Sequence, residues 1–415
     1  MIKVHRSKHS VSPVQHLVDI APKAAPYELA RLFSACSEAL GGTDTMVYLA
    51  DLQQDVLIPF APGGSISHDQ QLQALSIDST MAGRAFQTSK TQSQSADIDG
   101  SRLWIPIEGS SDRLGVLGVT VGSDVDLEDH SAGSLVSELH RLSVVAGSLI
   151  AAKTVYGDTL VSLRRLGEMG LAAEIQWSLL PPLTFVSELV SVAAALEPAY
   201  HVAGDTIDYA IDEDQTRVAI FDVMGHGLHS AQCAVLGVAA YRNARRSRRS
   251  LSDTLVCIED ALVAGFGSAV FLTAVVAELD TSTGLFSWAN AGHPEPVVIR
   301  GGRVVKSLSI ARTPPLGLGF LPSPLALGAE QLEPGDRVLF YTDGMVDARA
   351  PDGSFFGLER LTDLVIRHLA GGLGAAETMR RVTRELLEHH QGPLGDDASI
   401  MLLEWRNANE NNDIT

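Results

Sequence analysis

The sequence predicts an α+β protein with two folded domains joined by a helical segment. Three observations lead to this prediction. The chain has 415 residues, which is enough for two or three domains that each bury a core. Strand-like runs joined by short turns occur in both parts of the chain, and this pattern favours antiparallel sheets. Between the two parts, apolar residues recur at helical spacing.

The composition narrows the partners that we expect. The chain holds 31 Lys and Arg residues against 50 Asp and Glu residues, a formal charge of −19. This charge repels nucleic acid and anionic lipid, so we expect neither as a partner. The three cysteines are too few for a disulfide framework or a thiolate metal site. We see neither a signal-peptide pattern nor an apolar run of about 18 residues, so we expect no membrane span and a cytoplasmic protein.

The N-terminal part is predicted to be a small α+β domain over residues 24–152, preceded by a flexible tail at residues 1–23. We expect a helix at 28–40, strands at 46–50 and 56–60, a short helix at 80–86, and a hairpin of strands 103–107 and 114–121 with its turn at 109–112. A long helix follows. This order resembles a GAF domain, although no diagnostic motif is present. The resemblance implies a sensor for an unknown small-molecule or protein signal.

A seven-residue repeat follows this domain. One seam holds Leu135, Leu142, Leu149, Tyr156 and Leu163, and the second holds Leu139, Ala146, Lys153 and Leu160. Two such seams predict a left-handed coiled coil, and with it a homodimer through a helical linker at residues 153–184. The alternative is one amphipathic helix packed on its own domain. The polar Lys153 weakens the seam and Gly157 lowers helix propensity, so we expect a coil that is hinged or of marginal stability.

The C-terminal part is predicted to be a second domain over residues 185–406. It is rich in hairpins, with helices expected at 228–246, 251–263, 358–369 and 375–389. Its strands are too many for one parallel sheet, and their connections are short. We therefore expect an αββα sandwich, in which two mainly antiparallel sheets pack together with helices outside. A disordered tail is expected at residues 407–415.

Two aspartates of the second domain are predicted to face each other. Asp205 and Asp222 stand at the outer ends of a hairpin whose turn centres between Glu213 and Asp214, at equal distances from it. Directly opposed residues point to the same face of a sheet, with Cβ atoms about 4.5 to 5.5 Å apart. Two carboxylates at that distance repel each other or raise one pKa, and a divalent cation removes the conflict.

Two further acidic sites occur at strand ends. Asp343 follows the apolar run VLFYT, and the pair Asp396 and Asp397 precedes the final strand. Aspartates without clustered His or Cys are hard oxygen ligands, which select Mg²⁺ or Mn²⁺ over Zn²⁺. A pair of such ions can activate a bridging water and clamp a phosphoryl group. Each aspartate alone is more often a turn residue, so only the ordered set indicates a metal site.

Eight segments, taken in order, resemble the SpoIIE-like serine phosphatases, the bacterial branch of the metal-dependent 2C-type protein phosphatases. They are AAEIQWSLLPP (172–182), VAGDTIDY (202–209), FDVMGHG (221–227), NAGHPEP (290–296), PPLGLG (314–319), LEPGDRVLFYTDGMVDA (332–348), FFGLERL (355–361) and GDDASIML (395–402). Their number and order make the resemblance specific. It implies two Mn²⁺ or Mg²⁺ ions, with ligands at Asp205, Asp222, Asp343, Asp396 and the Val223 carbonyl. Asp397 ranks below Asp396, because alternation turns it to the other face of its strand.

Some residues depart from the family pattern. Ala203 stands where a glycine is usual, and Thr206 and Ile207 stand where aromatic residues are common. Met224 occupies the position of a candidate acid in eukaryotic relatives. We interpret two histidines and one basic run as structural: His226 at a helix start, His293 in a turn, and the run from Tyr241 to Arg249 as a solvated helix end. The alternative for that run is a site for a phosphorylated or acidic partner.

The resemblance implies hydrolysis of phosphoserine or phosphothreonine on a partner protein, such as a small anti-sigma factor antagonist, by a water that bridges two ions. We expect the GAF-like domain to regulate this activity through the linker. Two alternatives stay open at this point. One is a pseudophosphatase that binds a phosphorylated partner without turnover, which the departures near Asp205 favour. The other is a small-molecule phosphohydrolase, for which the sequence lacks a GxxxxGK[ST] loop.

Overall fold

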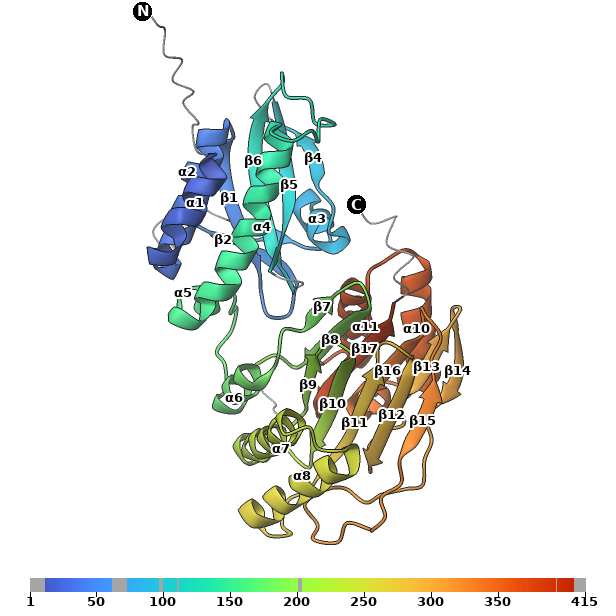
Figure 1. Cartoon of the computed structure of the whole chain (residues 1–415). Coiled ribbons are helices and arrows are strands. Elements are labelled where there is room, and N and C mark those ends of the chain that lie inside the picture. The colour runs from blue at the N-terminus through green and yellow to red at the C-terminus, as the bar shows by residue number, and fades with distance from the viewer. Residues whose placement is uncertain are drawn as a thin grey trace, which may run out of the picture. The chain divides into compact units, whose positions relative to one another are not determined.

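Two folding units, divided between Leu166 and Gly167, account for the α+β pattern (Figure 1). The computed structural model describes residues 12–61, 73–96, 100–109, 112–200, 204–392 and 394–406. One sheet lies in the first unit and two lie in the second. All pairs of the strands named below are antiparallel, as the short connections predict.

The first unit is built on a six-stranded sheet of order β3-β2-β1-β6-β5-β4. Its elements are α1 (Pro13–Ile20), η1 (Ala21–Lys23), η2 (Pro26–Glu28), α2 (Leu29–Leu40), β1 (Thr43–Ala50), β2 (Val56–Phe60), β3 (Leu75–Ser76), α3 (Met81–Thr88), β4 (Gln92–Ser95), β5 (Gly100–Gly109), β6 (Asp112–Gly122), α4 (Leu135–Lys153), η3 (Thr154–Tyr156) and α5 (Thr159–Leu163). Val47 and Leu49 of β1 face the core under α1, α2 and α4, whereas Tyr48 and Ala50 face the core under α3. The strand is therefore buried on both faces, with the expected period of two.

The helices and strands expected within residues 24–152 are present, while residues 110 and 111 of the expected hairpin turn lie outside the described residues. The prediction of a flexible tail is wrong for residues 13–23. Val14 and Leu17 of α1 are only 7% and 2% exposed, and Ala21 is fully buried. These positions recur at the spacing of one helix face, so α1 gains stability by packing on the core.

The seven-residue repeat does not form a continuous helix. The helix α4 ends at Lys153, Gly157 is extended, and the separate helix α5 follows. The inward positions of α4 fill the core of the first unit: Leu139, Leu142, Ala146 and Ile150. The coiled-coil prediction is therefore wrong for this segment, because its apolar seam is already buried within one unit. A homodimer through the linker stays a prediction.

The same helix passes a simple test for a membrane span, contrary to our expectation. Within the described ranges, one segment, Leu135–Tyr156, has the length and mean hydropathy of a span, 1.3 over an 18-residue window. Of that window, 39% is buried inside the structure. A helix that packs on a protein core needs an apolar face, and this packing explains the composition of α4.

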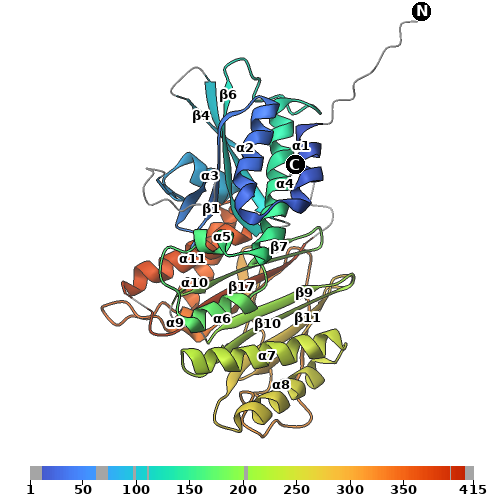
Figure 2. The ribbon, with the colours of Figure 1, turned by 90° about the vertical axis from the view of Figure 1, so that its left-hand side faces the viewer.

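The second unit is an αββα sandwich, as predicted (Figures 1 and 2). Its elements are α6 (Leu171–Leu179), β7 (Thr184–Val186), β8 (Val190–Glu197), β9 (Thr206–Ile211), β10 (Gln215–Val223), α7 (Leu228–Arg246), α8 (Leu251–Phe266), β11 (Leu272–Asp280), β12 (Leu285–Ala291), β13 (Val297–Arg300), β14 (Arg303–Ser307), β15 (Gly328–Gln331), β16 (Arg337–Tyr341), α9 (Asp343–Asp347), α10 (Leu358–Ala370), α11 (Ala375–His390) and β17 (Ala398–Trp405). One sheet has the order β15-β12-β11-β10-β9 and the other β14-β13-β16-β17-β8-β7. Helices α7 and α8 cover the first sheet, and α10 and α11 cover the second (Figure 2).

Alternation along the strands produces three apolar layers in this unit. Ile220 of β10 and Phe340 of β16 lie between the two sheets. Their neighbours in sequence point outward: Phe221 packs under α7 and α8, and Leu339 packs under α10 and α11. All four side chains are fully buried. Because each strand is fixed on both faces, the strand ends are held in defined positions.

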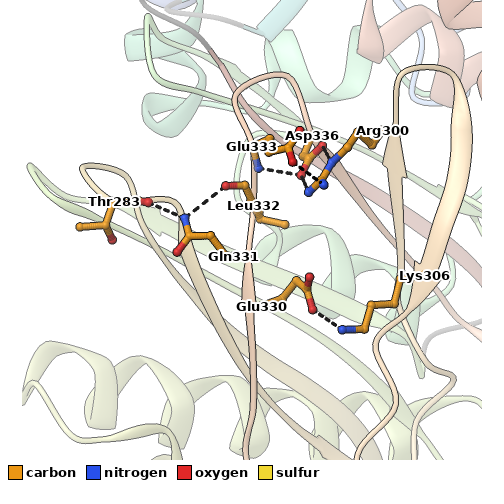
Figure 3. A network of polar contacts seen from close by, with 8 residues as sticks. All are labelled: Thr283, Arg300, Lys306, Glu330, Gln331, Leu332, Glu333 and Asp336. Atoms are coloured by element: carbon orange, nitrogen blue, oxygen red, sulfur yellow. Dashed lines mark hydrogen bonds and ion pairs between the residues drawn. The ribbon is translucent and has the colours of Figure 1, made fainter.

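Polar contacts connect the two sheets at one edge (Figure 3). Arg300 of β13 pairs with Asp336 at 2.5 Å and with Glu333 at 2.7 Å, both in the turn between β15 and β16. Lys306 of β14 pairs with Glu330 of β15, which belongs to the other sheet. These ion pairs fix the β13–β14 hairpin of one sheet to β15 of the other.

The fold accounts for part of the basic run. Arg242 and Arg245 of α7 pair with the buried Asp208 of β9 at 2.8 and 3.0 Å. Arg246 and Arg248 are exposed at the end of α7, where cations interact favourably with the helix dipole. The predicted solvated helix end thus describes Arg246 and Arg248, whereas Arg242 and Arg245 are structural through their ion pairs with a buried aspartate.

Candidate active site

The strands β9 and β10 pair in the register that the sequence predicts. Phe221 lies opposite Thr206 in the last pair of this ladder, and Asp222 and Asp205 are the next residues outward along the chain. On its other side, β10 pairs with β11, and Asp222 lies opposite Thr273. The hairpin thus places two carboxylates at one end of the five-stranded sheet.

Asp205 is held on several sides. It is 2% exposed, and the Thr342 hydroxyl donates to its Oδ2 at 2.7 Å. The Gln176 amide donates to its backbone carbonyl at 2.6 Å, and its own N–H donates to Asp397 Oδ2 at 3.0 Å. Burial, with further contributions from the Asp222 and Asp397 carboxylates, raises the pKa of Asp205 well above its usual range. Its position is therefore fixed by hydrogen bonds although its charge is opposed.

The six-stranded sheet contributes the other carboxylates. Asp343 begins α9 shortly after β16, and Asp396 and Asp397 directly precede β17. Gly344 makes their approach possible, since a Cβ atom at this position would lie 1.9 Å from the Asp397 carbonyl oxygen. That distance is far inside any van der Waals contact, so the Asp-Gly pair after β16 requires glycine for packing.

We refer to Asp205, Asp222, Asp343, Asp396 and Asp397 as the carboxylate cluster. Burial raises the pKa of Asp222 to about 7, and Asp343, Asp396 and Asp397 add to this rise. Partial burial, Asp396 and Asp347 likewise raise the pKa of Asp343. Within the described part of the chain, no Lys or Arg forms an ion pair with the cluster. The cluster thus holds negative charge that a bound cation would neutralise.

The two neighbouring aspartates before β17 differ in environment. Asp396 is exposed, and its Oδ1 accepts from the Asp397 N–H at 3.0 Å. Asp397 is 4% exposed and points toward the loop before β9, where its Oδ2 accepts from the N–H groups of Gly204 and Asp205. Burial raises the pKa of Asp397 to about 6. The two side chains thus differ in exposure, and the ranking of Asp396 above Asp397 as a ligand stays a prediction.

The donors of the cluster suit a hard divalent cation. All are carboxylate oxygens, and Asp397 Oδ1 is buried without a hydrogen-bond partner. The Val223 carbonyl oxygen faces the same loop, since a Cβ atom at Gly204 would lie 3.0 Å from it. In the conformation present, however, no three Asp, Glu, His or Cys side chains among the described residues are close enough to hold one ion. An ion held here would therefore need ligands besides side-chain carboxylates, such as a backbone carbonyl or water, and the individual ligands remain predictions.

The two histidines of the sequence analysis have different environments. His293 is 6% exposed, its N–H donates to Asn290 Oδ1 at 2.9 Å, and the Asn290 amide donates back to the His293 carbonyl at 2.9 Å. Burial lowers the pKa of His293 to about 3, so its ring is neutral. These contacts of His293 agree with its predicted structural role in a turn. His226 is exposed near the cluster, and its charge lowers the pKa of Asp397.

Two residues that support the site are absent from our predictions. Thr342 and Gln176 both contact Asp205, one through its carboxylate and one through its carbonyl. Both lie in segments that resemble the family, LEPGDRVLFYTDGMVDA and AAEIQWSLLPP, but nothing in the sequence links them to Asp205. Of the residues that depart from the family pattern, Thr206 and Ile207 are fully buried, and Ala203 lies outside the described residues.

An αββα sandwich with clustered, unpaired aspartates at the strand ends defines the PP2C class of protein phosphatases. Residues 212–406 match the sequence model of the family "Stage II sporulation protein E (SpoIIE)". The second unit is therefore a SpoIIE-type phosphatase domain. The match begins after Asp205, whose assignment rests on the strand register and the contacts described above.

Several known proteins are similar to this chain. Protein IcfG of Synechocystis is 26% identical over 58% of this chain and 42% of its own length. Phosphoserine phosphatase RsbU of Bacillus subtilis is 24% identical over 57% of this chain and 69% of its own length. Among solved structures, the SiaA-PP2C domain of Pseudomonas aeruginosa is 22% identical, covers 61% of this chain and 99% of that domain, and gives a TM-score of 0.47. The chain thus spans less than half of IcfG and about two thirds of RsbU.

Proposed function

We propose that this protein is a metal-dependent protein phosphatase that removes phosphate from phosphoserine or phosphothreonine on a partner protein. One observation carries the proposal: carboxylates from both sheets converge, no Lys or Arg of the described residues pairs with them, and neighbouring carboxylates help to raise the pKa of Asp205, Asp222, Asp343 and Asp397. The family match and the similarity to RsbU, named a phosphoserine phosphatase, support it. A small anti-sigma factor antagonist in the cytoplasm is the substrate class that we propose.

The residues of the site have distinct roles in this proposal. The carboxylate cluster would hold two Mn²⁺ or Mg²⁺ ions, and Thr342 and Gln176 keep Asp205 in place. Two such ions would lower the pKa of a bridging water and neutralise charge that develops on the phosphoryl oxygens. The buried neutral ring of His293 has no charge to offer, so we assign it no proton transfer.

The test is hydrolysis of a phosphoserine peptide by the full chain with added Mn²⁺ or Mg²⁺. Asp222→Asn should reduce kcat by at least about 10²-fold, because it removes a central ligand, and EDTA should abolish turnover. The matched control is Asp212→Asn, an exposed aspartate at the other end of the same hairpin. Full activity in EDTA, or in the Asp222→Asn variant, contradicts the proposal.

A second candidate is a pseudophosphatase that binds a phosphorylated partner without turnover. The departures near Asp205 favour it, since the unusual residues Thr206 and Ile207 are fully buried directly beside that aspartate. Calorimetry with Mn²⁺ separates the candidates when it is combined with the peptide assay. Ion binding with turnover supports the phosphatase, whereas capture of the phosphopeptide without turnover supports the pseudophosphatase.

We also propose that the GAF-like first unit regulates the second through α6. This helix is the first element after the division between the units, and its Gln176 donates to the Asp205 carbonyl in a buried hydrogen bond. A shift of α6 would therefore move a residue of the carboxylate cluster. Replacing Gln176 by Glu, which puts a repelling oxygen against that carbonyl, should lower activity without unfolding the protein.

A further inference from the structure

A cavity of about 640 Å³ lies beside the carboxylate cluster. Asp343 lines it from one side. The rest of the lining comes from the loop after β12, which includes His293 and Glu295, and from the segment between β14 and β15, which includes Arg312. The cavity is large enough for one or two side chains, and it is the place where a bound molecule could reach Asp343.

The cavity is also close to Asp222. Thr273 lies opposite Asp222 in the β10–β11 pair, and its hydroxyl oxygen lies 2.7 Å from His293 Nδ1. His293 in turn lines the cavity. Cluster residues of both sheets therefore lie in or next to its lining: Asp343 directly, and Asp222 through Thr273 and His293.

The segment that carries Arg312 is fixed in place by its neighbours. Leu316 exchanges two backbone hydrogen bonds with Leu272 of β11, at 2.9 and 2.8 Å. Glu259 of α8 accepts from the Gly319 N–H at 2.6 Å, and the Thr313 side chain is 4% exposed. Arg312 is thus an exposed side chain on an anchored backbone, which reduces the entropy lost when it binds a ligand.

Among the described residues that line this cavity, Arg312 is the one Lys or Arg. The ring of His293 is neutral, because burial lowers its pKa to about 3. The carboxylate of Glu295 accepts from the Ser309 hydroxyl at 2.5 Å. Arg312 forms no ion pair or hydrogen bond with another described residue. Its guanidinium is therefore free to bind an anion that enters the cavity.

We propose that this cavity receives the phosphorylated side chain of the substrate and that Arg312 is a substrate-binding residue that pairs with its phosphoryl group. The proposal rests on the proposed phosphatase function. The carboxylate cluster alone repels a phosphate dianion, so the group needs positive charge from cations at the cluster and from the Arg312 guanidinium in the same cavity. The planar donors of Arg match phosphate oxygens in a way that a Lys ammonium does not.

Steady-state kinetics with a phosphoserine peptide test this assignment. Arg312→Ala should raise KM at least about tenfold and change kcat by less than about threefold, since a hydrogen bond between charged groups is lost on substrate binding. Arg312→Lys should give an intermediate KM. The matched control is Arg303→Ala, which removes the same charge from an exposed position on β14 outside the cavity lining. A KM that is unchanged in Arg312→Ala, or raised equally in Arg303→Ala, overturns the proposal.

Binding of inorganic phosphate, measured by calorimetry in the presence of Mn²⁺, separates this inference from the proposed function. The affinity for phosphate should fall about tenfold or more in Arg312→Ala and stay unchanged in Arg303→Ala. If the wild-type chain hydrolyses no peptide but shows this difference, the phosphatase proposal fails and the role of Arg312 stands. Equal phosphate affinity in wild type and Arg312→Ala overturns the role of Arg312, whatever the activity.

Discussion

Replacing Asp222 by Asn should stabilise the metal-free protein although it abolishes metal-dependent hydrolysis. Burial and three neighbouring carboxylates raise the pKa of Asp222 from 3.8 to about 7. One pKa unit corresponds to ~1.4 kcal/mol, so ionised Asp222 costs at most about 4 kcal/mol of folding free energy above neutral pH. We expect a gain on the order of 2 kcal/mol, because the buried amide of Asn still needs hydrogen-bond partners.

The sign of the pH dependence follows from proton binding. Between its ordinary pKa of 3.8 and its folded value of about 7, Asp222 binds more protons in the folded state than in the unfolded state. The free energy of unfolding therefore falls as the pH rises through this range. Asp397, with a pKa of about 6, acts in the same direction. The advantage of Asp222→Asn should thus be small near pH 5 and reach its full size near pH 8.

Differential scanning calorimetry in EDTA provides the measurement. At about pH 8 the Asp222→Asn variant should unfold roughly 4 to 8 °C above the wild type, since ~1 kcal/mol shifts a domain of this size by about 2 to 4 °C. Added Mn²⁺ should raise Tm of the wild type more than Tm of the variant, because only the wild type keeps the full set of donors. Asp212→Asn serves again as the control and should leave Tm unchanged. A variant that is less stable than the wild type at pH 8 in EDTA refutes the idea that like charges strain this site.

Three further substitutions test the supports of the site. Gly344→Ala should destabilise the protein by about 3 kcal/mol or more and remove activity, because its methyl group overlaps a neighbouring carbonyl. The control Gly395→Ala should be tolerated, since no atom lies within 4 Å of the new Cβ, and chemical denaturation compares the two variants. Thr342→Val, which loses the hydrogen bond to Asp205, should destabilise by about 1 to 3 kcal/mol and raise the Mn²⁺ concentration needed for half-maximal activity, and an unchanged titration argues against this role. Gln176→Ala should reduce kcat about tenfold and destabilise by about 1 to 3 kcal/mol, because it leaves a buried carbonyl without its donor, and equal kcat in the two proteins argues against a role of α6 in the site.

The local part of the site could be predicted from the sequence. The predicted pairing of Asp205 with Asp222 depends only on the position of a turn, and the register of β9 and β10 agrees with it up to the last pair, Phe221 with Thr206. The αββα sandwich likewise follows from strand alternation and short connections, and both sheets have the expected antiparallel order. In these cases the relevant contacts join residues that are close along the chain or related by a simple period.

The contacts that could not be predicted join segments far apart in the sequence. Gln176 contacts Asp205, and Arg312 shares a cavity with Asp343, through packing that no single segment encodes. The coiled-coil prediction failed for a related reason. A seven-residue repeat describes one apolar face of a helix, and it does not distinguish a second chain from the domain's own sheet, on which Leu139 packs.

The carboxylate cluster takes its members from both sheets of the sandwich, Asp205 and Asp222 from one and Asp343, Asp396 and Asp397 from the other. A cation held between them would thus act as a removable cross-link at the open end of the two layers, opposing the repulsion that otherwise pushes them apart. Any force that changes the spacing of the layers would then change ion affinity, and ion occupancy would in turn resist that force. The spacing between the two sheets would therefore determine both how tightly the domain binds ions and how rigid it is.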